Sequence, residues 1–141
     1  MNTNRPMLDM IVRRQPVTLP PDTPVRDACR AMRDQRIGAV LVTDPAGRLL
    51  GIFTGRDAVC RMLAEGRDPA TTPLEQVMTP RPQTLRPDAR AIEALRLMQD
   101  CGCRHVPVTV GEQLLGIVSR GDFRAAELDR LEAESILWES M

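Results

Sequence analysis

The feature that most constrains this chain is an internal duplication. The stretch Gly51–Asp57 reads G-I-F-T-G-R-D, and a second version, G-I-V-S-R-G-D, follows at Gly116–Asp122. Upstream matches such as Thr18 and Thr84 lie 66 positions apart, whereas the two motifs lie 65 apart, so the second copy lacks one residue in a turn. A period this long, with its gap at a turn, predicts two copies of one supersecondary unit that pack on each other.

Apolar periodicity predicts the order strand, helix, strand, strand, helix within each copy. In the first copy the expected elements are Pro16–Leu19, a helix from Pro24 with Thr23 as its N-cap, Ala39–Thr43 buried on both faces, Leu49–Phe53, and a helix from Gly55 to a stop at Gly66. The last helix is expected to bury one face, made of Ala58, Val59, Met62 and Leu63. The chain is therefore expected to be an α/β protein of two βαββα repeats.

The second copy repeats this order after a proline-rich linker. Its expected elements are Gln83–Leu85, Asp88–Gln99, His105–Val110, Gln113–Val118 and a helix from Gly121, with Gly111-Glu112 as a two-residue hairpin turn. We place repeat one at about 7–66, the linker at 67–82 and repeat two at about 83–123, all within one module of residues 1–141. Within the linker, Thr72 and Glu75 have capping-box spacing and predict a short helix over 73–78.

Segments at both ends extend the repeats. Apolar residues between Met7 and Val12 predict a short helical lead-in. The last helix is expected to be extended, over 121–141, with an apolar stripe at spacings of three and four that ends at Trp138 and Met141. This stripe suits packing on the helix's own domain and contact with a second copy of the chain equally well.

Charge and composition narrow the class of function. Basic and acidic residues number 19 each, which gives a formal net charge of zero and argues against a nucleic-acid or membrane partner. Aromatic residues make up only 2% of the chain, so stacking platforms for single-stranded bases are scarce. The start of the chain is polar and no apolar run approaches a membrane span, which predicts a cytoplasmic location.

Four cysteines are present, and none is assigned to a metal. Cys29 and Cys60 lie among the apolar positions of predicted helices, as small buried hydrophobes do. Cys101 and Cys103 could form a ligand pair or a redox pair, yet no second cysteine pair and no histidine at metal spacing accompanies them. We therefore favour a structural role for the pair.

The repeated motif itself suits a nucleotide. A strand that turns at once into a helix directs backbone amides toward a phosphate, and Thr54 or Ser119 adds a hydroxyl there. Three residues later, Asp57 or Asp122 can accept both hydrogen bonds of a ribose diol. The alternative is ordinary helix capping, which needs no ligand.

In order, spacing and duplication, the chain resembles a tandem pair of CBS domains, the cystathionine-β-synthase type regulatory module. The fragments that carry the resemblance are Val17-Thr18, Gly38–Val42, Gly51–Asp57, Val77–Pro80, Arg104–Val108 and Gly116–Asp122. The resemblance implies small mixed sheets related by a pseudo-two-fold axis and assembly into a homodimer. It also implies AMP, ADP, ATP or S-adenosylmethionine as a regulatory ligand bound between the repeats, with no cofactor required.

Carried over by position, the resemblance assigns one set of binding residues to each copy. The first set is Thr18, Gly38, Ala39, Thr54, Arg56 and Asp57. The second set is Thr84, Arg104, His105, Pro107, Ser119, Arg120 and Asp122, and it fits the family pattern better because Leu41 replaces the proline in the first copy. The implied function is sensing of an adenosyl compound and signalling to an effector protein; the alternative is a ligand-free scaffold.

Catalysis is not expected. His105 is the only histidine, and neither a nucleophile nor an orienting carboxylate accompanies it at a recognisable spacing. We therefore interpret it as a contact to the base or phosphate, or as a packed polar side chain, in a protein that is not an enzyme.

Overall fold

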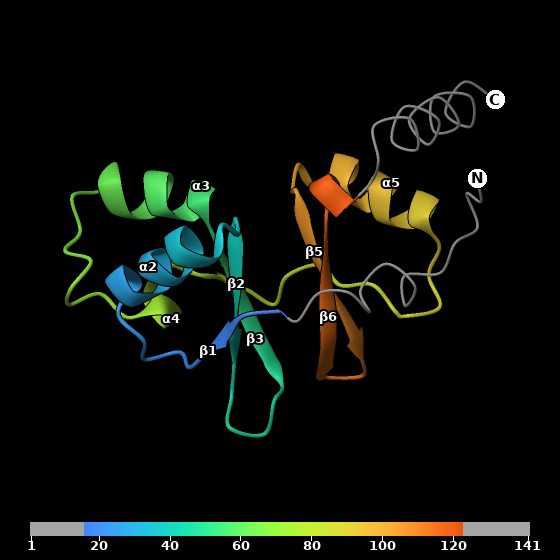
Figure 1. The fold of residues 1–141 in the computed structure, drawn as a ribbon, viewed down its shortest axis with the longest axis horizontal. Helices are drawn as coiled ribbons and strands as arrows, with labels where there is room; N and C mark the ends of the chain where they lie inside the picture. Colours follow the sequence, from blue (N-terminus) through green and yellow to red (C-terminus); the bar gives the residue numbers. More distant parts are fainter. Residues whose placement is uncertain (1–15, 123–141) are drawn as a thin grey trace. The chain divides into compact units, whose positions relative to one another are not determined.

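A computed structural model of the chain describes residues 16–122 (Figure 1). These residues form two compact units, and the chain passes from the first to the second between Pro82 and Gln83. Each unit combines helices with a small sheet, which confirms the predicted α/β class. The two units are described one at a time.

The first unit is built on a four-stranded mixed sheet. Its strands are β1 (Thr18–Leu19), β2 (Ala39–Thr43), β3 (Leu49–Thr54) and β4 (Thr79–Pro80), in the spatial order β1-β2-β3-β4. Strand β1 is parallel to β2, whereas the β2–β3 and β3–β4 pairs are antiparallel. The first four residues of β2 are buried, as the continuous apolar run Ala39–Val42 predicts.

Three helical segments lie on one side of this sheet (Figure 1). They are α2 (Val25–Gln35), α3 (Gly55–Asp57), which continues as a π-helix over Ala58–Leu63, and α4 (Leu74–Val77). The core between helices and sheet consists of Val25, Ala28, Val40, Val42, Phe53, Met62, Leu74 and Val77. Alternate residues of β2 and β3 therefore meet the apolar stripe of α2, as the sequence pattern requires.

Two predicted helix caps are wrong, because backbone carbonyls rather than side chains accept hydrogen bonds from the amides at the helix starts. The N-cap of α2 is Pro24, and Thr23 instead accepts the Leu74 amide on its carbonyl at 2.9 Å. Thr72 does not cap α4; its hydroxyl donates to the Asp68 carbonyl at 2.7 Å. The starts of the two helices pair with each other at Pro24 and Pro73, which satisfies amides that sequence alone left to side chains.

The predicted apolar face of the helix after Gly55 is half wrong. Met62 is buried, but Val59 and Leu63 are 56% and 77% exposed. The segment is a π-helix, in which the Ala64 amide donates to the carbonyl five residues back, at Val59. Ala58 and Met62 pack on the core, whereas Val59 and Leu63 lie outside it. Gly66 has a φ of +66° and ends the segment as predicted.

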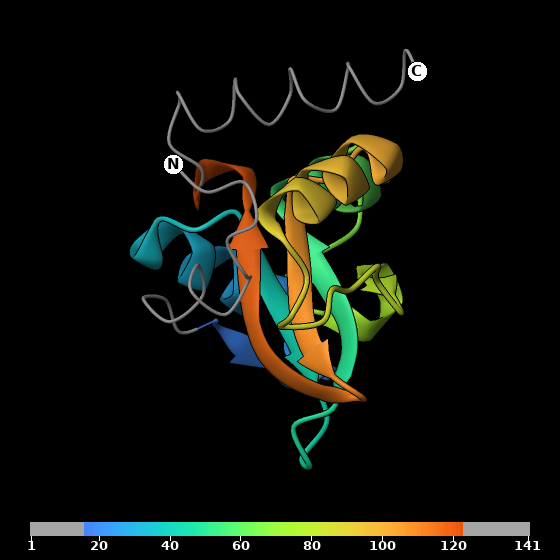
Figure 2. The same ribbon diagram turned by 90° about the vertical axis from the view of Figure 1, so that its right-hand side faces the viewer.

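The second unit consists of a helix on a β-hairpin (Figure 2). Its elements are α5 (Ala91–Cys101), β5 (His105–Val110), β6 (Gln113–Ser119) and a single 3₁₀ turn over Arg120–Asp122. The expected strand at 83–85 is reduced to one parallel bridge from Leu85 to Val108. Gly111 and Glu112 close the hairpin as predicted, and Gly111 takes a φ of +59° that favours glycine.

The segment 67–82, which we interpreted as a linker, contacts the first unit throughout. The Arg26 amide donates to the Pro69 carbonyl at 3.0 Å, and β4 pairs with β3 at Gly51 and Ile52. The predicted lead-in helix and the extended C-terminal helix lie outside the described residues. Among residues 16–122, no helix is long and apolar enough to cross a membrane.

Candidate ligand-binding site

The two motifs occupy the same position in their hairpins. Thr54 ends β3 opposite Ala39, and Ser119 ends β6 opposite His105. The pairing register is shared along both hairpins, and each is interrupted by one bulge, after Val42 in the first and after Val108 in the second. The duplication therefore extends to the backbone hydrogen bonds.

A backbone hydrogen bond joins each motif to the strand beside it. The Gly55 amide donates to the Gly38 carbonyl at 3.2 Å, and the Arg120 amide donates to the Arg104 carbonyl at 2.9 Å. Each copy thus brings the residue expected to hold ribose and phosphate next to those expected to contact the base. Sequence spacing could not show this, because the pairs lie 16 or more positions apart.

In the first unit the motif forms a complete capping box. The Thr54 amide and hydroxyl both donate to Oδ2 of Asp57, at 3.0 and 3.1 Å, and the Asp57 amide donates to the Thr54 hydroxyl at 3.3 Å. The Thr54 hydroxyl has one proton to donate, and it donates that proton to Asp57. The first motif thus matches the alternative interpretation, ordinary helix capping without a ligand. The cap uses the Thr54 hydroxyl and the Asp57 carboxylate, the same groups that a ligand would contact.

Arg61 is a residue of this site that the sequence reasoning missed. Its Nε lies 3.6 Å from Oδ1 of Asp57, whose side chain is only 12% exposed. Its guanidinium also donates to the carbonyls of Val77 at 3.2 Å and Met78 at 2.8 Å. The signal was present, because Asp57 and Arg61 are four residues apart on a helix. At the matching place after Asp122 the sequence has Ala126.

In the second unit the cap differs. Oδ2 of Asp122 accepts the Ser119 amide at 2.7 Å, as Asp57 accepts the Thr54 amide. Within residues 16–122, however, the Ser119 hydroxyl makes no hydrogen bond to Asp122. A half-buried hydroxyl beside a half-buried carboxylate is thus available to donate to a ligand.

Two further predicted residues, Thr18 and Thr84, lie in the segment beside the first hairpin strand of each unit. Thr18 is exposed on β1 and pairs with Leu41, two positions along β2 from Ala39. Thr84 is exposed and precedes Leu85, whose amide donates to the carbonyl of the buried Pro107 at 2.9 Å. Both threonines therefore lie in the segment that runs parallel to the first hairpin strand, in equivalent positions, although only Thr18 is part of a strand.

The two arginines differ in setting. Arg56 is exposed, whereas Arg120 is half-buried and follows Ser119 directly. Among the described residues, no group of three or more histidine, cysteine, aspartate or glutamate side chains could hold a metal ion. The chemistry on offer in each unit is thus a carboxylate, a hydroxyl, an arginine and strand-end backbone, which suits a neutral diol linked to a phosphate.

Comparison of the sequence with models of protein families identifies the family of both repeats. The model described as "CBS domain" matches residues 8–63 and again residues 74–129. The chain belongs to the CBS-domain family. The resemblance seen in the sequence is confirmed, and so is the tandem arrangement.

Two relatives in sequence carry the same domain name. "CBS domain-containing protein YhcV" of Bacillus subtilis is 31% identical over 123 residues, which cover 87% of this chain and 86% of that protein. "CBS domain-containing protein CBSCBSPB3" of Arabidopsis thaliana is 38% identical over 102 residues, 72% of this chain. That stretch is only 18% of the Arabidopsis protein, so this CBS pair matches one part of a much longer chain.

Solved structures give the same result for the fold. A putative signal-transduction protein with CBS domains from Burkholderia ambifaria has a TM-score of 0.73 at 33% identity and covers 77% of this chain and 79% of its own. The CBS domain protein PAE2072 from Pyrobaculum aerophilum, complexed with AMP, has a TM-score of 0.80 at 24% identity. It covers 92% of this chain and 99% of its own. CBS-domain architecture is therefore common to all of them.

Proposed function

We propose that this CBS pair is a regulatory module that senses an adenosyl compound by binding it, without chemistry on the ligand. The observation that carries the proposal is the duplicated Ser/Thr-x-x-Asp element, held in both units at the same register beside residues 38–39 and 104–105. That a protein of this fold, PAE2072, is complexed with AMP supports an adenine nucleotide over other diols.

The second unit is the stronger candidate for the occupied site. Asp122 would accept the ribose diol, and the Ser119 hydroxyl would donate to the phosphate, because the cap leaves that hydroxyl unengaged within residues 16–122. Arg120 supplies a positive charge next to it, and Arg104 and His105 adjoin the motif through the hairpin. AMP, ADP, ATP and S-adenosylmethionine all present the diol that this set requires.

Signalling would follow from a ligand's unequal affinity for two arrangements of the chain. The output passes to a separate effector protein, and the homodimer and cytoplasmic location expected from the sequence are part of this proposal. Light scattering of the purified chain tests the dimer directly; a monomer mass at micromolar concentration would contradict it.

One observation favours a second candidate function, a ligand-free scaffold. In the first unit the capping box is complete, and Asp57 also contacts Arg61. A cap of this kind stabilises a helix start by about 0.5–2 kcal/mol with no ligand at all. If the second motif did the same, the repeats would only hold the fold and offer surfaces to other proteins.

Thermal unfolding with AMP, ADP, ATP and S-adenosylmethionine separates the two functions. A ligand that binds only the folded state stabilises it by about 2.7 kcal/mol at a concentration one hundred times its Kd. We expect at least one of the four to raise the midpoint. If none does so at millimolar concentration, the scaffold stands and the sensing proposal fails.

Variants then locate the site. Asp122→Ala should weaken binding at least tenfold by isothermal titration calorimetry, because the diol loses its acceptor. Asp88→Ala is the matched control, since Asp88 is an exposed aspartate of the same unit, 3.3 Å from Arg86. Circular dichroism confirms that each variant is folded before titration. Full binding by the Asp122→Ala variant would show that the ligand lies elsewhere.

A further inference from the structure

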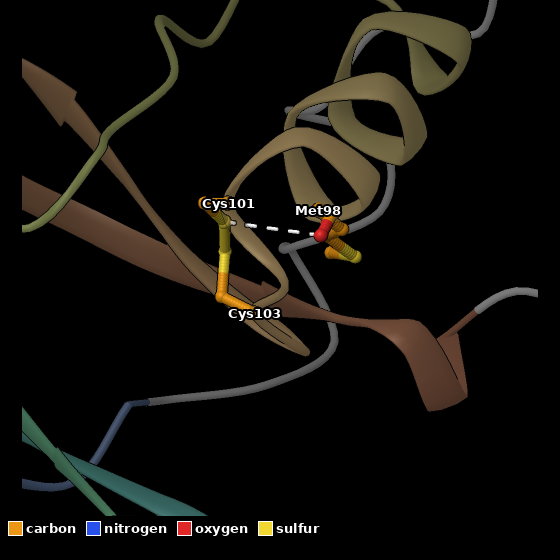
Figure 3. Close-up of a disulfide and its surroundings, with 3 residues drawn as sticks. All are labelled: Met98, Cys101 and Cys103. Atoms are coloured by element: carbon orange, nitrogen blue, oxygen red, sulfur yellow. Dashed lines mark hydrogen bonds between the residues drawn. A yellow bond between two sulfur atoms is a disulfide. The ribbon is translucent and has the colours of Figure 1, made fainter.

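The C-terminal end of α5 holds a pair of cysteines that the proposed function does not use. Cys101 and Cys103 flank Gly102 and are joined by a disulfide (Figure 3). Their Cα atoms lie 5.3 Å apart, within the range that a disulfide spans without backbone movement. The sequence pattern favoured a structural role for the two, so the question is whether the turn needs the bond.

The first unit answers it, because it contains the same turn without cysteines. Helix α2 is capped at its C-terminal end by Arg36, with a φ of +55°, and the Ile37 amide donates to the Met32 carbonyl at 3.0 Å. In the second unit Gly102 has a φ of +67° and the Cys103 amide donates to the Met98 carbonyl at 3.1 Å. The backbone thus adopts this cap on its own, and it holds positions 101 and 103 together whether or not the sulfurs are bonded.

The two sulfurs have different surroundings. Cys101 is exposed, and its Sγ lies 3.9 Å from the Met98 carbonyl oxygen, which is an acceptor for a thiol in the reduced state (Figure 3). Cys103 is half-buried and packs against the core of the second unit. An external thiol or disulfide therefore reaches Cys101 first, and Cys103 is positioned to complete the exchange.

We propose that Cys101 and Cys103 are a reversible dithiol–disulfide site that exchanges with small-molecule disulfides such as glutathione disulfide. The Cys101 thiolate attacks glutathione disulfide, which forms a mixed disulfide and releases one glutathione. The Cys103 thiolate then attacks the Cys101 sulfur and displaces the second. Two electrons pass from the dithiol to glutathione disulfide, and the two protons end on the two glutathione thiols.

The state of the pair is transmitted to the candidate binding site through the backbone. Cys103 is followed by Arg104, whose carbonyl accepts the Arg120 amide, and then by His105, which pairs with Ser119. The cap keeps its backbone form in both states, and closing the small ring restricts the motion of Gly102 and of the residues that follow it. Cytosolic disulfides are mostly transient and catalytic or redox-sensing, so in the proposed cytoplasmic location this one would respond to oxidation rather than persist.

Equilibration in glutathione redox buffers, followed by alkylation and mass spectrometry, tests the exchange. Cys101 and Cys103 should lose alkylation together in one two-electron transition, while Cys29 and Cys60 stay alkylated. The matched control is Cys60→Ser, which changes an exposed cysteine of the first unit. It should leave the midpoint of the oxidation of Cys101 and Cys103 unchanged. In the Cys103→Ser variant, Cys101 should instead accumulate the glutathione adduct. Accumulation of that adduct in the unmodified chain, or no oxidation at 101 and 103, would overturn the proposal.

Amide spectra of the oxidised and reduced chain test the transmission without any nucleotide. We expect chemical-shift changes at Arg104, His105 and Arg120, and none in the Cys101→Ser variant, where the change of an exposed side chain leaves the fold intact. Changes that end at Cys103 would refute transmission. Because no adenosyl ligand takes part, a failure here is distinct from a failure of the proposed sensing function.

Discussion

The two units share their hairpin and the helix that precedes it, and they differ in the elements and polar contacts around the motif. Both pair the motif with the same strand position, and both place a bulge at the same step. The first unit adds β4 and α4 and a complete capping box with Arg61. Within the described residues, the second unit has a two-stranded sheet, a cap without the hydroxyl and a disulfide.

This contrast shows that the pairing register of the hairpin strands can be the same in two copies whose polar contacts at the motif differ. Register depends on the alternation of apolar residues and on the turns, and it is retained because a slip of one residue would expose every core side chain of the strand. Cap contacts involve a few polar groups, each worth about a kilocalorie per mole, and can diverge between copies while the fold persists. The copy whose Ser or Thr hydroxyl is not bonded to its own aspartate is then the better candidate for ligand.

The largest expected effect is that of adding a side chain at Gly51, the first residue of the first motif, where β4 pairs with β3. A Cβ there would lie 2.5 Å from Sδ of Met78 and 2.9 Å from the backbone oxygen of Thr79. Gly51→Ala should therefore lower the free energy of unfolding by about 1–3 kcal/mol in urea titration. Gly55→Ala is the control, because a Cβ at Gly55 meets nothing within 4 Å. Equal effects of the two would mean that β4 does not hold the first unit together.

Removing the two motif aspartates should give unequal losses. Asp57→Ala deletes the carboxylate that accepts the Thr54 amide and hydroxyl and one of the partners of Arg61, and we expect a cost of about 1–2 kcal/mol. Asp122→Ala deletes the acceptor of the Ser119 amide but no bond from the Ser119 hydroxyl, and it should cost about 0.5–1 kcal/mol. Urea unfolding of the ligand-free chain measures both. A larger loss at Asp122 would reverse the assignment of the first motif as the structural one.

The smallest expected effect concerns the turn between β2 and β3. The Arg48 amide, with the Arg48 side chain and the Ala46 amide, holds the pKa of Asp44 below its ordinary value. A depressed pKa in the folded state means that this contribution is present above the ordinary aspartate pKa and is lost as the pH falls through the folded value. The difference in the midpoint of urea unfolding between wild type and Asp44→Asn should thus be small at pH 7 and should shrink as the pH falls below the ordinary aspartate pKa. A difference that stays unchanged across the acid range would refute the role of the charge.

Much of the fold could be predicted because its signals are local. The runs that became β2, β3, β5 and β6 are bounded by turn residues, and the two-residue hairpin at Gly111 follows from turn chemistry. The misses are cases where a distant backbone segment competed with a side chain. Thr23 and Thr72 have the right type and spacing to cap, yet the pairing of Pro24 with Pro73 made those caps unnecessary.

Sequence by itself determined the duplication, the α/β class, the family and the residue types at each motif, because these depend on order and spacing along the chain. Only the tertiary structure decided that Thr54 is consumed by its own cap, that Arg61 reaches Asp57, and that the turn at Gly102 brings two cysteines together. The physical reason is that hydrogen bonds and sulfur contacts depend on ångström-scale distances between groups. Two motifs that look alike in sequence therefore differ in which of their atoms are left for a ligand.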